Sequence, residues 1–208
     1  MTRVLKIFWI VLLVIISFLF LYWGKCQLGI NLIEGFSWER QLPFLNVFQG
    51  KDHFVHPKPG VLLSSSFDEV FPYWPWNKLW AREPGLVEHR LAREGVKGSL
   101  CFLVRSSSTM DWAIYHYHVL AVAPGDAFLF EGFVRSSGKA EGKLSVILYD
   151  EDEKVLDWGF AAGKVQREAW TRVSERFVVP AGARYLRFQL TGSGAGDVSF
   201  DDIRFVKE

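Results

Sequence analysis

Short runs of β-forming residues, each closed by a turn signal, repeat along the chain from Val61 to its end. Clusters rich in Gly and Pro, such as APGD, SSGKAEG and VPAG, separate these runs. No stretch of this region has the 3.6-residue apolar period of a long amphipathic helix. About eight or more strands at this spacing predict an all-β domain over residues 61–208, either a β-sandwich or a jelly roll.

The first 27 residues have a different character. An uncharged apolar run of 17 residues extends from Ile7 to Trp23, and Arg3 and Lys6 precede it. As a helix this run would extend roughly 25 Å, at the short end of what crosses a bilayer. Bulky rings stand where a cleavage site needs small residues, so we predict an uncleaved signal anchor, one transmembrane helix within residues 1–27. A cleaved signal peptide and a buried core helix are the alternatives.

The charges around this run predict its orientation. Basic residues on its N-terminal side favour a cytoplasmic N-terminus, which places the rest of the chain outside the cytoplasm, in a cell envelope. Residues 28–60 lack a clean apolar period and end in the turn-forming cluster at 57–60. We therefore expect residues 28–60 to connect the anchor to the β-domain.

The composition argues against two classes of protein. Half of the residues are hydrophobic and 16% are aromatic, which is too apolar for a disordered chain. The formal net charge is only +1, and no basic stripe stands out. We therefore expect no nucleic-acid partner.

The sequence contains no recognisable catalytic motif. It lacks both the G-x-S-x-G nucleophile elbow and the H-E-x-x-H zinc helix. The acidic run YDEDEK is typical of a solvated turn rather than of the opposed carboxylates of a glycosidase. The glycine-rich stretch at 192–196 precedes a strand-like run, so it predicts a hairpin turn rather than a phosphate-binding loop. We therefore expect a protein that is not an enzyme.

His116 and His118 alternate with Tyr115 and Tyr117 in the run AIYHYHV. In a strand, both histidines lie on one face and both tyrosines on the other. A His-x-His pair is a candidate transition-metal site, but no third ligand at a clear spacing joins it. Hydrogen-bonded histidines with a structural or ligand-facing role are the favoured interpretation.

Five segments of the β-domain follow one another in a recognisable order: SSSFDEVFPYWPW, EGVKGSLCF, HVLAVAPGDAFLFEGFVR, AWTRVSERFVVPAGARYLRFQL and FDDIRF. This ordered set, over about residues 61–207, resembles carbohydrate-binding modules of the family 4/9/22 type. The chain departs from the family pattern at Asp68, where a glutamate is usual, and at His118, where a glutamine is usual. The resemblance implies a galactose-binding-like jelly roll, a β-sandwich of two antiparallel sheets of which one is concave.

The resemblance also implies one structural calcium ion. In such modules the acidic residue after the first Phe and the final Asp pair hold the ion. Here these positions are Asp68, Asp201 and Asp202, joined by backbone oxygens near Gly98. Oxygen ligands of this kind suit a hard cation. The alternative is that Asp201 and Asp202 only cap the end of a strand.

Strand alternation divides the side chains of three predicted strands between two faces. The positions that match the family's core leave an outward set: Glu131, Phe133, Tyr149, Arg187 and Gln189. If the three strands are neighbours, these side chains share one face. Such a face suits a glycan, because rings stack on sugars while amides and charged groups bond to hydroxyls. The alternative is a solvated sheet face with incidental aromatics.

The segment YWPWNKLW, residues 73–80, carries four aromatic rings. The resemblance implies that Trp76 or Trp74 packs at one end of the sandwich. Trp80 then lacks an assigned core position, as do Trp112 and Trp158. An exposed ring in a loop is a binding candidate, so Trp80 completes the predicted ligand-binding set.

Two functions from different classes fit these observations. The first is a membrane-anchored, non-catalytic module outside the cytoplasm that binds a glycan or polysaccharide. The alternative is a protein–protein interaction or scaffolding subunit of an envelope complex that uses the same fold. A groove with exposed rings and hydrogen-bonding groups would favour the first, and a flat apolar patch continuous with residues 36–48 the second.

Overall fold

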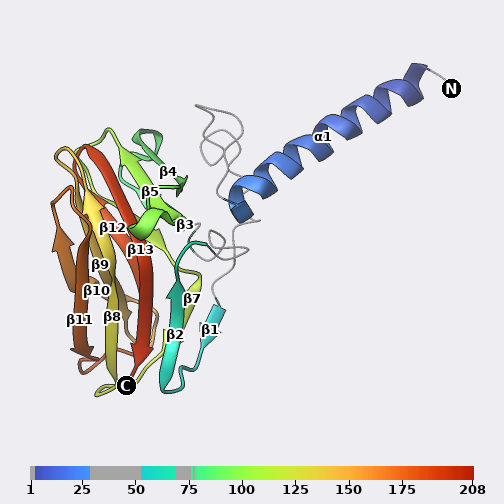
Figure 1. Ribbon diagram of the computed structural model, residues 1–208. Coiled ribbons are helices and arrows are strands. Elements are labelled where there is room, and N and C mark those ends of the chain that lie inside the picture. Colours follow the sequence, from blue (N-terminus) through green and yellow to red (C-terminus); the bar gives the residue numbers. More distant parts are fainter. Residues whose placement is uncertain (1–2, 29–52, 69–75, 77) are drawn as a thin grey trace.

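The computed structural model describes residues 3–28, 53–68, 76 and 78–208. The described chain has one α-helix, α1 (Arg3–Leu28), and thirteen strands in two sheets that face each other (Figure 1). Two short 3-10 helices, η3 (Pro84–Leu86) and η4 (Val96–Gly98), lie in the connections between strands.

Sheet A has seven strands: β1 (His53–Val55), β3 (Lys78–Ala81), β6 (Trp112–Tyr115), β7 (His118–Ala121), β9 (Glu141–Tyr149), β10 (Val155–Val165) and β12 (Tyr185–Ser193). The strand β12 is central, because it pairs with β9 on one side and with both β6 and β7 on the other. The sheet is completed by β10 beside β9 and by β3 beside β6. The order across its middle is therefore β3–β6–β12–β9–β10. Only the pairing of β1 with β7 is parallel among the pairings in this sheet.

Sheet B has six strands: β2 (Gly60–Ser65), β4 (Val87–Ala92), β5 (Cys101–Ser106), β8 (Ala127–Ser136), β11 (Thr171–Val178) and β13 (Gly196–Lys207). Here β13 is central, with β8 on one side and β5 and β2 on the other. The strands β11 and β4 pair with β8 and β5, respectively. The predicted all-β sandwich of two antiparallel sheets is confirmed.

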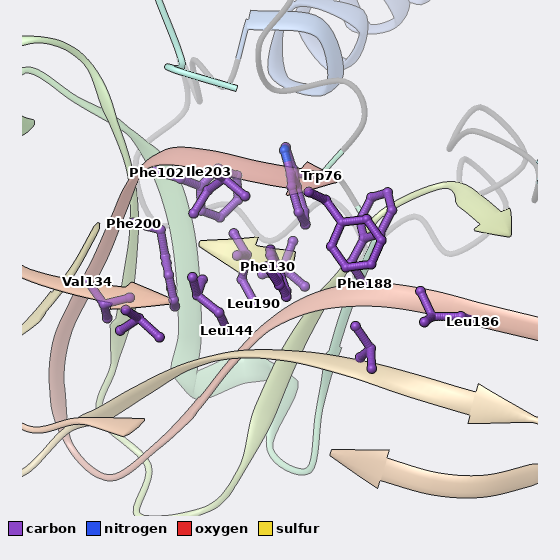
Figure 2. Packing of buried hydrophobic residues seen from close by; sticks show 14 of the residues in the cluster. Trp76, Phe102, Phe130, Val134, Leu144, Leu186, Phe188, Leu190, Phe200 and Ile203 are labelled. Atoms are coloured by element: carbon purple, nitrogen blue, oxygen red, sulfur yellow. The ribbon is translucent and has the colours of Figure 1, made fainter. Parts of the chain in front are cut away.

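The core lies between the sheets (Figure 2), and most of its largest fully buried side chains are phenylalanines. Phe130 of sheet B and Phe188 of sheet A both contact Phe205, with ring centroids 5.2 and 5.1 Å apart. The predicted inward positions of three strands are buried: Phe128, Phe130 and Val134, then Leu144, Val146 and Leu148, then Leu186, Phe188 and Leu190. Burying a Phe side chain contributes about 1.5–3 kcal/mol, so this cluster is a main source of stability.

Two of the tryptophans close the core. Trp76 is fully buried against His116 and Phe188, with ring centroids 4.8 and 6.0 Å away, which agrees with the prediction that Trp76 or Trp74 packs. Trp112 is also buried, with its ring edge-on to Phe200. Trp112 therefore has a core position that the sequence did not indicate. Trp74 lies outside the described residues.

The predicted transmembrane helix within residues 1–27 is not supported. The segment does form helix α1, but within the described residues no helix is long and apolar enough to cross a membrane.

Two connections also differ from expectation. The glycine-rich turn at 192–196 was expected to close a hairpin, but it joins β12 of sheet A to β13 of sheet B and so crosses between the sheets. Gly194 and Gly196 have positive φ in this turn, a backbone that glycine adopts at little cost. The end of the predicted 28–60 connector also contributes a strand, since β1 pairs with β7.

Candidate functional site

A cleft of about 580 Å³ lies on the outer face of sheet A, the face turned away from sheet B. All five strands across the middle of the sheet contribute to it. Its lining residues are Trp80, Arg82, Asp111, Trp112, Ala113, Tyr115, Lys143, Ser145, Trp158, Gly159, Gln189, Thr191, Gly192 and Ser193. The volume and the mixture of rings and polar groups are typical of ligand sites.

One cross-strand row explains why the sheet is hollow here. Trp80 on β3 pairs with Ala113, and Thr191 on β12 pairs with Ala113 on one side and Lys143 on the other. Directly opposite residues share a face of the sheet. Small side chains in the middle of the row therefore form a floor between a 43%-exposed Trp80 and Lys143.

A second row supplies polar groups to the floor. Lys78, Tyr115, Gln189 and Ser145 lie opposite one another on β3, β6, β12 and β9. Ser145 and Gln189 are buried. The Ser145 hydroxyl lies 3.4 Å from the hydroxyl of Thr191, which links the two rows.

An irregular stretch of β10 forms the wall opposite Trp80. The register between β10 and β9 shifts between Val155 and Gly163, as in a β-bulge. Gly159 N donates to Asp157 Oδ1 at 2.8 Å, which tightens this stretch. Bulges re-aim side chains, and Trp158 at this one is 65% exposed. The two exposed tryptophans thus stand on opposite edge strands with the cleft between them.

Tyr115, Tyr149 and Arg187 form a polar cluster on the same face. The Arg187 guanidinium carbon lies 6.0 Å from the Tyr115 ring centroid, within cation–π range. Burial raises the pKa of Tyr115 to about 12; Tyr149 acts in the same direction, and the positive charge of Arg187 opposes both. Tyr115 is therefore a neutral phenol at physiological pH, able to donate and accept hydrogen bonds.

Ion pairs surround the Trp80 end of the cleft. Arg82 binds Asp111 through two bonds, Nε to Oδ1 at 2.7 Å and Nη2 to Oδ2 at 3.2 Å. The hydrogen bond from Arg82 lowers the pKa of the Asp111 carboxyl. Asp111 is therefore ionised at neutral pH, unlike the raised-pKa acid that glycoside hydrolysis needs.

The predicted ligand-binding residues separate into two groups. Trp80 and Gln189 line the cleft, and Tyr149 and Arg187 lie on the same face of sheet A. Glu131 and Phe133 do not join them, because β8 belongs to sheet B. The expectation that all these side chains share one face is therefore wrong for Glu131 and Phe133.

Glu131 instead has ion-pair partners on its own sheet. It accepts from Arg172 at 2.7 Å and from Arg204 at 3.3 Å. Strand parity alone could not assign β8 to a sheet, because both sheets alternate in the same way. Strand alternation did place Tyr115 and His116 on opposite faces. It was the signal that could have added Tyr115 to the predicted ligand-binding set, which lacks this residue.

The predicted calcium ligands hold a loop through hydrogen bonds. Asp201 is fully buried, and Oδ2 accepts from Val96 N at 2.7 Å and Ser99 Oγ at 2.9 Å. Its Oδ1 accepts from Asp202 N at 2.8 Å. Asp68 Oδ1 accepts from Leu100 N at 3.0 Å. These carboxylates anchor the connection before β5 from two sides.

The groups around Asp201 do not suit a calcium ion. The groups facing Asp201 are N–H and O–H donors, whereas calcium needs six to eight oxygen ligands. Among residues 3–28, 53–68, 76 and 78–208, no group of three or more His, Cys, Asp or Glu side chains is placed to hold a metal ion. Calcium binding by Asp68, Asp201 and Asp202 stays a prediction.

His116 and His118 belong to the packing behind the cleft. His116 is buried between Trp76 and Phe188, and Nδ1 accepts from the backbone N–H of His118 at 3.1 Å. Burial lowers the pKa of His116 well below its usual value, and His118 and Arg187 act in the same direction. A neutral, hydrogen-bonded His116 agrees with the structural role favoured from the sequence.

No family model and no curated protein matches this chain in sequence. Solved structures do match. The CBM22-1–GH10 modules of Clostridium thermocellum endo-1,4-beta-D-xylanase 10B, complexed with xylohexaose, share 20% identity with a TM-score of 0.51. That match covers 71% of this chain and 28% of the xylanase chain.

Two further matches span different kinds of protein. The CBM22-1 xylan-binding domain of Paenibacillus barcinonensis Xyn10C matches at 19% identity and a TM-score of 0.50, over 73% of this chain and 97% of that domain. The enzymatically active domain of bacteriophage CBA120 tailspike protein 4 matches at 10% identity and a TM-score of 0.52, over 69% of this chain and 20% of that one. At these identities the likeness establishes the fold: this chain carries a β-sandwich similar to those of CBM22 carbohydrate-binding modules.

Proposed function

We propose that this protein binds a glycan in the cleft of sheet A and performs no catalysis on it. The observation that carries the proposal is the placement of Trp80 and Trp158. Their exposed rings stand on opposite edge strands of one sheet, with a polar floor between them. Sugar rings have apolar faces that pack on such rings, while their hydroxyls need the polar groups below.

The floor offers suitable partners for hydroxyls. Tyr115 is a neutral phenol, and Thr191 and Lys143 line the cleft beside it. The similar structures support a saccharide ligand, because the xylanase was solved with xylohexaose and the Paenibacillus domain is described as xylan-binding. Fold likeness alone does not transfer a ligand, so the proposal depends on the geometry of the cleft.

The test is binding of oligosaccharides to the full-length chain, measured by isothermal titration calorimetry with xylohexaose and a panel of other hexasaccharides. We expect saturable binding that weakens roughly 10-fold or more in Trp80→Ala and in Trp158→Ala, because central aromatic residues dominate most interfaces. The Gln189 side-chain amide donates to the backbone carbonyl of Trp158. Trp158→Ala keeps this carbonyl and removes only the ring.

Trp170→Ala is the matched control. Trp170 packs beneath Arg135 of sheet B, with the guanidinium carbon 4.9 Å from the ring centroid, away from the cleft. Its loss should leave glycan affinity unchanged. If glycan affinity falls equally in all three variants, or if the folded wild type binds no glycan, the proposal is wrong and a protein partner is favoured instead.

A further inference from the structure

Two lysines lie directly opposite each other at one side of the cleft. Lys143 on β9 pairs with Lys164 on β10 in the antiparallel ladder. Like charges in this position destabilise a sheet unless an anion lies between them. Glu141 supplies one carboxylate, and its Oε1 lies 3.4 Å from Lys143 Nζ and 3.5 Å from Lys164 Nζ. Two ammonium groups therefore share a single carboxylate oxygen.

The neighbouring ion pair does not balance this excess. Arg82 and Asp111 neutralise each other through their two hydrogen bonds. Taken together, these two groups of ion pairs contain three cations, Arg82, Lys143 and Lys164, and two carboxylates, Asp111 and Glu141. Lys143 lies close enough to Asp111 to lower the pKa of that carboxyl, so the excess positive charge faces the cleft.

The floor of the cleft is low between Trp80 and Lys143, the lysine of the pair that lines it. Lys143 shares a cross-strand row with Trp80, and Ala113 and Thr191 are the only residues between them in that row. Three strand spacings separate the two ends of the row, about 14 Å. A saccharide stacked on Trp80 therefore extends over a low floor toward Lys143.

From this arrangement we propose that the cleft selects acidic glycans, and that Lys143 and Lys164 bind the carboxylate of a uronic acid unit. The inference rests on the proposed glycan-binding function and adds its ligand class. A sugar carboxylate would supply the second anion that the lysine pair lacks. Charge-assisted hydrogen bonds of this kind are stronger than those to neutral hydroxyls.

The experiment compares acidic oligosaccharides with neutral forms of the same backbone. Hexamers of galacturonate, glucuronate and mannuronate, each with its methyl ester, are titrated against the full-length chain, with xylohexaose as a neutral ligand of the same length. We expect at least one acid to bind roughly 5-fold or more tighter than its own ester at low salt, as a part-exposed ion pair allows. The difference should shrink at 0.5 M salt, where the Debye length falls to about 4 Å.

Variants then assign the effect to the lysine pair. Lys143→Gln and Lys164→Gln should each reduce the preference for the acid, and Glu141→Gln should increase it, because the internal competitor carboxylate is gone. Lys154→Gln is the control, since Lys154 pairs with Asp152 in the exposed turn after β9. Thermal melts of each variant confirm that the fold is retained.

The outcomes separate the two proposals. If xylohexaose or the esters bind and every acid binds no better than its ester, the acidic preference is wrong and glycan binding stands. If an acid preference exists but survives in both lysine variants, the assignment to this pair is wrong. If no saccharide binds the folded chain, the proposed function itself fails and the inference fails with it.

Discussion

The side-chain amide of Gln189 donates a hydrogen bond to the backbone carbonyl of Trp158, with Nε2 2.5 Å from the oxygen. The strand β9 lies between the strands of these two residues, so the straight separation of those strands is about 10 Å. The bulge in β10 must therefore lean over the small side chain of Ser145 to come within reach. Gln189 is only 2% exposed, so we expect it to support the wall of the cleft rather than to contact a ligand directly.

We predict that Gln189→Ala loosens the wall and weakens glycan binding together. The carbonyl of Trp158 loses its donor, and a cavity opens under the bulge, at a cost of about 1–3 kcal/mol in the free energy of unfolding. Hydrogen exchange of the backbone amides at 157–161 should accelerate. Urea denaturation and exchange mass spectrometry measure both effects.

The exposed Gln166→Ala is the matched control for this prediction. It should change neither stability nor exchange at 157–161. If the amides at 157–161 exchange at the wild-type rate in Gln189→Ala while glycan binding is weakened, Gln189 contacts the ligand itself, as the sequence first indicated.

Much of the fold follows from local sequence pattern. The alternation of apolar residues correctly assigned the inward side chains of β8, β9 and β12, such as Phe130, Val146 and Phe188. Alternation reports which face a residue takes within its own strand, and this information is local. It cannot report which strands are neighbours, because pairing is decided by packing between segments far apart in the chain.

The candidate site shows this limit directly. Arg187 and Tyr149 were correctly grouped because β12 and β9 pair, whereas Glu131 was grouped with them although β8 lies in the other sheet. The exposed ring of Trp158 lies where a bulge interrupts β10, an irregularity that alternation does not predict. Alternation also gives no core position to Trp112, because its ring packs edge-on against Phe200 of β13, which is far away in the chain.

Glu131 is expected to stabilise sheet B and to have no effect on glycan binding. The hydrogen bond from Arg172 lowers the pKa of Glu131, and Arg204 adds to it. An acid with a lowered pKa in the folded state contributes stability above its unfolded pKa of about 4.5, and this contribution is lost as the pH falls through the folded value. Glu131→Gln should therefore cost about 0.5–1 kcal/mol at pH 7.

The difference between Glu131→Gln and wild type should disappear only when the pH falls below the lowered folded pKa of Glu131, where the wild-type carboxyl is protonated as well. Denaturant unfolding at several pH values measures this. Glu151→Gln, in the exposed turn after β9, is the control and should match wild type. Loss of glycan affinity in Glu131→Gln would contradict the assignment of this residue to sheet B alone.

The floor of the cleft depends on the absence of a side chain at Gly192. A Cβ there would lie 2.4 Å from Cζ2 of Trp112 and 2.6 Å from the carbonyl oxygen of Glu141. Gly192→Ala should therefore displace the buried indole and cost about 1–3 kcal/mol. A Cβ at Gly159, which also lines the cleft, would meet no atom within 4 Å. Gly159→Ala is thus the matched control, and equal melting temperatures for the two variants would contradict this account.

His116 predicts a loss of stability in mild acid. Burial lowers its pKa well below the ordinary 6.5, and His118 and Arg187 act in the same direction. The unfolded chain then binds a proton more readily than the folded one. Stability should be full above about pH 6.5 and should fall below it by up to about 1.4 kcal/mol per pH unit, until the folded imidazole is protonated too.

His116→Asn tests this without removing the acceptor that the His118 amide uses. The variant should be less stable than wild type at pH 8, because Asn packs poorly between Trp76 and Phe188, but its stability should decline less steeply between pH 6.5 and pH 5. The exposed His56→Asn should keep the wild-type slope. Urea unfolding at half-unit pH steps provides the comparison, and a wild-type slope in His116→Asn would assign the acid sensitivity to a different group.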